Sequence, residues 1–205
     1  MTEVDFEGAR QYALKLLEEK LDAELVYHDI AHTRDDVVPA AERLAEREGI
    51  TGEDLLLLRT AAYYHDIGFV EQSANHELVS VRIASEKLPD FGYSPEQIRR
   101  ISGMILATRL PQTPNNILEA IMADADLDVL GRESDFWERN RDLRAEWELT
   151  TPPMNDEEWY RGQLKFLTEH TYFTEAAHDL RDAGKRRLLK VIFQRWRAAR
   201  DKLRD

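Results

Sequence analysis

The amino-acid sequence predicts an all-α protein, a single-domain helical bundle of about nine helices. Two observations support this fold class. No segment alternates apolar and polar residues over the length of a strand, whereas apolar residues recur at intervals of three and four positions. Two of these periodic segments also follow a small polar residue that has Glu or Gln three positions later, which is a helix start signal. At 205 residues the chain is long enough to bury one core.

The first two helices are predicted from an apolar stripe and from a periodic segment that stops at a glycine. The stripe comprises Phe6, Ala9, Ala13, Leu16, Leu17 and Leu21. The second helix should run from about Ile30 to Glu48 and end before Gly49. Pro39 lies inside this segment and should kink it, because proline removes a backbone donor.

The next three helices are predicted mainly from their start signals. Thr51, with Asp54 three positions later, resembles a capping arrangement for a helix that ends at His65. Another helix should span His76–Leu88. The stretch Ser94-Pro95-Glu96-Gln97 combines a capping box with proline at the first helical position and should start the fifth helix.

Four more helices are expected in the C-terminal half. An apolar segment ending at Gly131 predicts the first, and the Pro152-Pro153 break separates the second from the third. The predicted ranges are Ile117–Leu130, Ser134–Leu149, Asn155–His170 and Glu175–Lys202.

The charge is distributed unevenly. The whole chain carries a net charge of −12, yet residues 181–205 hold ten Lys or Arg against three Asp or Glu. The other 180 residues hold 18 basic and 37 acidic groups. We expect the basic C-terminal helix to present a solvated face, and the negative overall field argues against a nucleic-acid partner.

The chain has no cysteine, which excludes disulfides, thiolate metal ligands and a cysteine nucleophile. The longest aliphatic run, Leu55–Leu58, is far too short to span a bilayer. The acidic start, Met1–Asp5, lacks the basic and apolar regions of a secretory leader. A soluble cytoplasmic protein without a membrane partner is expected, while its oligomeric state is left open.

Three polar clusters stand inside apolar helical sequence. The pair His65-Asp66 closes one predicted helix, and His28 and His32 are spaced to share a helix face. Asp124 and Asp126 close another apolar segment. Imidazole nitrogens and carboxylate oxygens together are ligands for divalent cations, and a buried unpaired carboxylate is costly.

Ordinary structural roles could also explain these residues. His65-Asp66 could be a histidine near a helix C-terminus beside a capping aspartate, and Asp124 and Asp126 could form caps or salt bridges. On spacing alone, a metal site and these structural roles are about equally supported.

The same motifs resemble the HD-domain superfamily of metal-dependent phosphohydrolases. The order of the family pattern is His, then His-Asp, then Asp. It is matched here by Tyr27–Thr33, Tyr64–Gly68, Asn75–Ser80 and Asp124–Gly131. The resemblance implies an all-α fold whose motif core covers residues 27–131. The helices of residues 134–205 are expected to pack on this core within one domain, residues 1–205.

The resemblance implies that His32, His65, Asp66 and Asp126 bind a divalent metal ion. Asp124 is the rival for the last position, and the family's alignment favours Asp126. Manganese, iron, magnesium, cobalt, nickel and zinc all suit such ligands. Many members carry a further histidine where this chain reads Ala107-Thr108-Arg109. Its absence argues against two metal ions.

The resemblance further implies hydrolysis of a phosphate ester of a small molecule, such as a nucleotide, by water that the metal activates. Asp66 would anchor the metal and steer the water, and Glu77 or His28 would assist proton transfer. Arg109 is the preferred phosphate contact, since guanidinium binds phosphate in a bidentate manner. Arg141 and Arg144 are weaker candidates, and each could instead form a surface salt bridge.

Three alternatives remain open at this point. The chain could be a di-iron oxygenase with the same fold, or a module that senses a nucleotide or metal without turnover. A nuclease is a third possibility, which the negative net charge disfavours.

Overall fold

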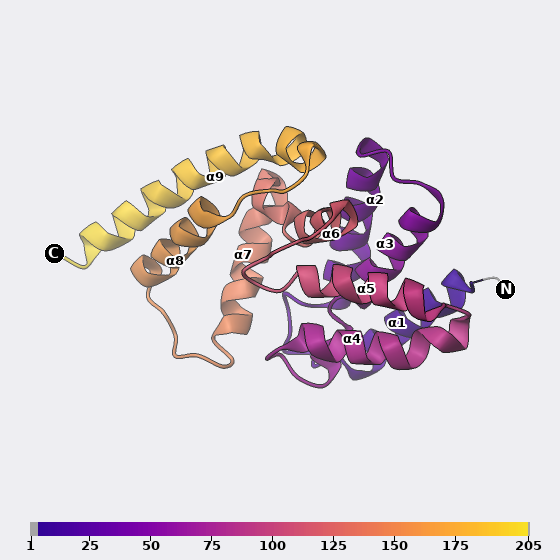
Figure 1. Cartoon of the computed structure of the whole chain (residues 1–205). Coiled ribbons are helices and arrows are strands. Elements are labelled where there is room, and N and C mark those ends of the chain that lie inside the picture. Colours follow the sequence, from indigo (N-terminus) through magenta and orange to yellow (C-terminus); the bar gives the residue numbers. More distant parts are fainter. Residues whose placement is uncertain (1–3, 205) are drawn as a thin grey trace. The chain divides into compact units, whose positions relative to one another are not determined.

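The computed structural model describes residues 4–204, so that Met1–Glu3 of the acidic start and Asp205 lie outside the described residues. Within the described range the chain forms nine α-helices and no strand, which confirms the all-α prediction (Figure 1). The α-helices are α1 Phe6–Lys20, α2 Val38–Arg47, α3 Gly52–Tyr64, α4 His76–Lys87, α5 Pro95–Ala107, α6 Ile117–Asp126, α7 Glu133–Trp147, α8 Asp156–Glu169 and α9 Glu175–Lys202.

The chain divides into two compact units, Met1–Leu127 and Asp128–Asp205. The first unit contains α1 to α6, and the second contains α7 to α9. That residues 1–205 act as a single domain stays a prediction.

Helix α3 is the centre of the N-terminal unit, where it packs against α1, α2, α5 and α6. Its side chains are buried on nearly every side, and Leu57, Leu58 and Tyr64 are fully inaccessible to solvent. Each such apolar side chain contributes about 1.5–3 kcal/mol on burial. Every residue from Thr60 to Tyr64 is buried, and the polar pair that follows, His65-Asp66, also lies inside the protein.

The structure refines two local predictions for this unit. The segment predicted as a helix from about Ile30 to Glu48 is helical from Ile30 to Arg47, and it contains a π-helical stretch, His32–Val37, which leads directly into α2. Pro39 then lies in the first turn of α2, where it has no N–H to donate to the preceding π-helical stretch. Thr51 does occupy the N-cap of α3, but its side chain makes no capping hydrogen bond. Asp54 instead forms an ion pair with Arg100 of α5.

The capping box predicted for α5 is confirmed. The Ser94 hydroxyl accepts a hydrogen bond from the backbone N–H of Gln97, and the Gln97 side chain accepts one from the Ser94 N–H. The helix predicted over Ile117–Leu130 is shorter than expected, because α6 ends at Asp126 and a separate 3₁₀ turn, Asp128–Gly131, follows.

Gly68 allows a close approach between α4 and the 3₁₀ turn Ile67–Val70. The Gly68 N–H donates to the Ser80 hydroxyl of α4 at 2.9 Å. A Cβ atom at position 68 would lie 2.1 Å from the His76 carbonyl oxygen and 2.9 Å from the Ser80 nitrogen. Both are backbone atoms of α4, so neither can move aside on its own.

Replacing Gly68 by alanine should therefore lower the free energy of unfolding by about 1–3 kcal/mol, the usual cost of overpacking. Gly162→Ala is the matched control, because nothing lies within 4 Å of a Cβ at that exposed helical position. The control should raise stability by roughly 0.5–1 kcal/mol, since alanine favours helix. Urea denaturation of both variants tests this, and equal stabilities would contradict the close-approach argument.

In the C-terminal unit, α8 and α9 lie side by side (Figure 1). The start of α8 meets the end of α9, where the Trp196 indole N–H donates to Glu157. The end of α8 meets the middle of α9, where Lys185 donates to the ring and backbone carbonyl of His170. The helices are therefore antiparallel. The capping box at the start of α8 formed by Asn155 and Glu158 is confirmed.

Burial, together with the nearby charge of Lys185, lowers the pKa of His170 to about 4. The unfolded chain should bind this proton near pH 6.5 and the folded chain only near pH 4. The contribution of His170 to stability is therefore present above pH 6.5 and is lost as the pH falls toward 4.

We expect the free energy of unfolding of His170→Gln to fall less steeply than that of the wild type between pH 6.5 and 4. The difference in slope should be at most about 1.4 kcal/mol per pH unit. Chemical denaturation at several pH values measures it, and parallel pH profiles would argue against a neutral, half-buried His170.

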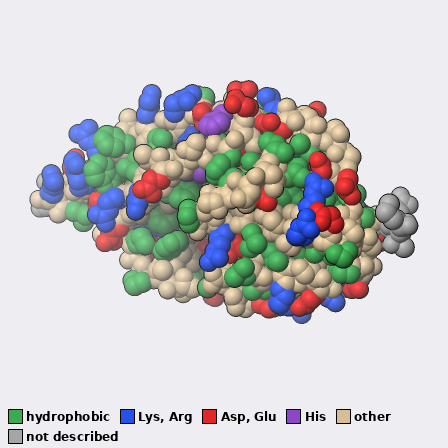
Figure 2. Space-filling model, viewed as in Figure 1, with side chains coloured by type: hydrophobic (Ala, Val, Ile, Leu, Met, Phe, Trp, Pro, Cys, Tyr) green, Lys and Arg blue, Asp and Glu red, His purple; other side chains and the backbone are tan. Residues whose placement is uncertain are grey.

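Lys and Arg side chains gather over the C-terminal end of α9, at the left of Figure 2. This agrees with the expected solvated basic face, because most side chains of the last turns are exposed. Among the described residues, no helix combines the length and the apolar character that crossing a bilayer requires. The cytoplasmic location stays a prediction.

Candidate metal centre

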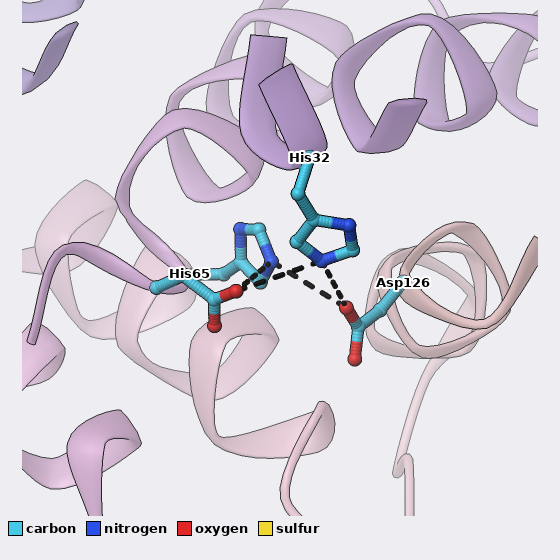
Figure 3. A group of neighbouring side chains, drawn as sticks. His32, His65 and Asp126 are labelled. Atoms are coloured by element: carbon cyan, nitrogen blue, oxygen red, sulfur yellow. Dashed lines mark hydrogen bonds and ion pairs between the residues drawn. The ribbon is translucent and has the colours of Figure 1, made fainter. Parts of the chain in front are cut away.

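Four side chains from three separate segments converge inside the N-terminal unit. They are His32, His65, Asp66 and Asp126, and each offers a ligand atom within 4.8 Å of the others. His32 begins the π-helical stretch, His65 and Asp66 directly follow α3, and Asp126 is the last residue of α6. Figure 3 shows the two imidazoles and the Asp126 carboxylate facing a common point.

The ligand atoms are the Nε2 atoms of both histidines and one oxygen of each carboxylate. His65 Nε2 lies 3.1 Å from Asp66 Oδ2 and 3.4 Å from Asp126 Oδ1. His32 Nε2 lies 3.3 Å from Asp126 Oδ1 and 3.6 Å from Asp66 Oδ2. Separations of this size between nitrogen and oxygen are what neighbouring ligands of one small cation would show, since each ligand sits roughly 2 Å from the ion.

The orientation of His65 identifies the free nitrogen. Its Nδ1 lies 2.8 Å from the carbonyl oxygen of Ala62, which can only accept, so Nδ1 carries the proton. In the neutral ring, Nε2 therefore offers its lone pair to the cluster. This arrangement, in which one ring nitrogen donates to a carbonyl and the other faces the ligand point, is common among metal-bound histidines.

Two buried atoms of the cluster lack a hydrogen bond. His65 Nε2 and Asp66 Oδ2 are both inaccessible and make no hydrogen bond, although they lie 3.1 Å apart. The residues are also among the most buried polar groups, with His65 0% and Asp66 5% exposed. Buried polar atoms are normally satisfied, so an orphaned imidazole nitrogen beside an orphaned carboxylate oxygen fits a divalent cation between them.

The electrostatic environment of the cluster favours a positive charge at its centre. Burial acts to lower the pKa of His65, but the charges of Asp66 and Asp126 outweigh it and raise this pKa well above its usual value. Burial acts to raise the pKa of Asp66, but the His65 charge outweighs it and lowers the pKa well below its usual value. Burial likewise opposes ionisation of Asp126, yet the facing imidazoles of His32 and His65 lower its pKa to about 2.

The structure brings Asp126 into the cluster and leaves Asp124 outside it. Asp124 is fully buried on α6 and is not without a partner. Residues two apart on a helix point about 200° away from each other, so only one of the pair can face the cluster.

The predicted catalytic candidates lie at the edge of the cluster. Glu77 is buried in the first turn of α4, next to His76, whose Nε2 lies 3.2 Å from Asp66 Oδ1 and 3.8 Å from Glu77 Oε1. The His28 ring lies with its centre 5.8 Å from that of His32. Asp66 therefore presents one oxygen to His65 and the other to His76.

The predicted phosphate contacts fall in different places. Arg109 follows α5 and donates to the Asn75 side chain at 2.9 Å, directly before His76. Arg141 is exposed on α7. Arg144 joins α7 to the start of α8 through Asp156, at 2.7 Å, and through the Met154 carbonyl. The contacts of Arg144 lie within the C-terminal unit and match its structural alternative.

An all-α fold with a buried cluster of two histidines and two aspartates has the arrangement of a helical metal-binding domain. Residues 36–128 match the family model of the HD domain, which supports an HD-domain protein. The matched stretch contains His65, Asp66 and Asp126, and His32 lies four positions before it. The resemblance expected from the sequence is therefore confirmed.

A solved structure shares this fold. The crystal structure of a predicted HD superfamily hydrolase from an uncultured Thermotogales bacterium is similar with a TM-score of 0.57 and 22% sequence identity. The similarity covers 92% of this chain and 91% of that chain. The comparison with curated proteins finds no match.

Proposed function

We propose that this HD-domain protein is a divalent-metal-dependent hydrolase that cleaves a phosphate ester of a small molecule, with nucleotides as the first substrate class to test. The observation that carries the proposal is the pair of orphaned buried atoms, His65 Nε2 and Asp66 Oδ2, inside a cluster of four ligands. The hydrolase named for the similar solved structure supports the same reaction class.

His32, His65, Asp66 and Asp126 would hold the ion. Two neutral imidazoles and two carboxylates balance the charge of a divalent cation and leave part of its coordination sphere for water and substrate. A bound divalent ion lowers the pKa of a water ligand by several units and polarises a phosphoryl oxygen.

The surrounding residues have roles that follow from their places. Glu77, buried beside the His76 ring that faces Asp66, would accept a proton from the attacking water, and His28 is the second candidate for this role. Arg109, held by Asn75 next to the start of α4, would bind the substrate phosphate with its guanidinium. Arg141 and Arg144 stay predictions.

One observation favours a second cation, as in the di-iron alternative. Asp66 Oδ1 faces His76 Nε2 at 3.2 Å while Asp66 Oδ2 faces the first cluster, so this carboxylate could bridge two ions. The lack of a histidine at Ala107–Arg109 favours a single ion. Elemental analysis separates the two cases as one or two metals per chain.

The proposal is tested by measuring bound metal and then phosphate release from a panel of nucleotides and other phosphate esters. We expect release that depends on added Mn²⁺ and is lost on chelation. Metal bound without release from any member of the panel would favour the sensing module, and iron with oxygen consumption would favour the oxygenase.

A further inference from the structure

The Phe69 side chain lies against two imidazoles at the edge of the metal cluster. Its ring centre is 4.3 Å from that of His28, with 21° between the ring planes. It is 4.0 Å from that of His76, with 26° between the planes. Phe69 is only 8% exposed, so its ring is held in place at the edge of the metal cluster. Nothing in the sequence motifs had singled it out.

The backbone around Phe69 fixes the ring independently of any bound ion. Phe69 belongs to the 3₁₀ turn Ile67–Val70, and its N–H donates to the Asp66 carbonyl at 3.0 Å. The close approach at Gly68 presses this turn against the first turn of α4, which begins at His76. The stacking partner of His76 is therefore supplied by the turn that directly follows Asp66.

Two contacts together set the plane of the His76 ring. Its Nδ1 donates to the Ser73 carbonyl at 3.1 Å. This hydrogen bond alone would still let the ring rotate about the hydrogen-bond axis. Stacking on Phe69 removes this freedom and leaves Nε2 directed at Asp66 Oδ1. An imidazole that must face one carboxylate oxygen gains from such support, because a displaced ring loses the contact.

We propose that Phe69 is a positioning residue, whose ring holds the imidazoles of His28 and His76 at the edge of the cluster so that His76 Nε2 stays on Asp66 Oδ1. The kinetic consequence rests on the proposed hydrolase function. The structural consequence does not, since it concerns the ring orientations in the metal-free protein.

Phe69→Leu keeps an apolar side chain and removes the ring, and Phe69→Tyr keeps the ring. The first readout is the ¹H–¹³C spectrum of the histidine rings at one fixed pH without metal. Signals of His28 and His76 should shift in Phe69→Leu and return toward their wild-type positions in Phe69→Tyr. Signals of His170 and His178, in the other unit, should stay in place.

The second readout is a double-mutant cycle on phosphate release. Phe69→Leu should lower kcat about tenfold, change KM less than about twofold and retain bound Mn²⁺. Combined with His76→Ala, it should cause no further loss, because both changes remove the same oriented ring. Phe193→Leu, at an exposed phenylalanine on α9, is the matched control and should leave kcat unchanged.

Unshifted His28 and His76 signals in Phe69→Leu, or losses that multiply in the double variant, would overturn the proposal. If Phe69→Leu does not fold, Phe69→Met takes its place, since methionine fills irregular apolar space. A wild type that releases no phosphate, together with the expected ring shifts, would refute the hydrolase and leave the positioning role established.

Discussion

Replacing His65 by alanine should yield a folded protein that binds no stoichiometric metal and releases no phosphate. His65 supplies the orphaned Nε2 at the centre of the cluster, in contact distance of both carboxylates. Loss of this ligand should weaken metal affinity by at least about 100-fold, more than loss of a supporting residue does. Elemental analysis and the phosphate-release assay measure the two effects on the same preparation.

Thermal unfolding provides a separate check that needs no substrate. At 100 times its dissociation constant, Mn²⁺ stabilises a native protein by about 2.7 kcal/mol, which raises the Tm of a chain of this size by roughly 5–11 °C. We expect this rise in the wild type and in His178→Ala, whose histidine pairs with Asp182 in the other unit, but not in His65→Ala. Equal shifts in all three proteins would exclude the cluster as the metal site.

Replacing Arg181 by alanine should produce a large loss of stability away from the metal centre. Arg181 of α9 donates two hydrogen bonds to Asp128, at 2.6 Å and 2.9 Å, and Asp128 is only 3% exposed. Removal of one partner of a buried ion pair typically costs about 3–5 kcal/mol, because the remaining charge keeps its desolvation penalty. Arg132, 3.6 Å from Asp128, still faces that charge, so the lower value is expected here. The lower value predicts a fall in Tm of roughly 6–12 °C.

Arg187→Ala is the matched control on the same helix. Arg187 pairs with Glu133, but both side chains are largely exposed, at 59% and 44%. Exposed ion pairs contribute at most about 1 kcal/mol, so the Tm of this variant should stay close to that of the wild type. Thermal unfolding of both variants, followed by circular dichroism, measures the two falls in Tm. Similar small falls would mean that the Arg181–Asp128 pair contributes little to stability.

Much of the helical fold could be predicted because its determinants are local. The capping boxes at Ser94 and Asn155 act within a few residues, and helical periodicity is visible in the sequence itself. The π-helical stretch at His32 and the break after Asp126 were not predicted. Their backbone conformations depend on packing between segments far apart in the sequence.

The candidate site was likewise predictable only in part, because some of its features depend on tertiary packing. Spacing alone did not decide whether Asp124 or Asp126 is the last metal ligand. The family pattern, rather than physical chemistry, favoured Asp126. The structure separates them because the orientation of α6 turns only one carboxylate to the cluster. The contacts of Phe69 with two histidines had no signal in the sequence, since ring stacking requires the tertiary arrangement.

The hydrogen bond from His65 to the Ala62 carbonyl has a consequence for the kinetics of metal exchange. The acceptor belongs to the last turn of α3, where carbonyl groups have no partner within the helix. The imidazole is thereby held in one orientation when the helix forms, and its rotational entropy is lost during folding rather than on capture of the ion. Because the ring is preorganised, an ion can bind without waiting for a side-chain rearrangement, and the association rate constants of different metals should be similar. Differences in their affinities should then come mainly from their dissociation rate constants.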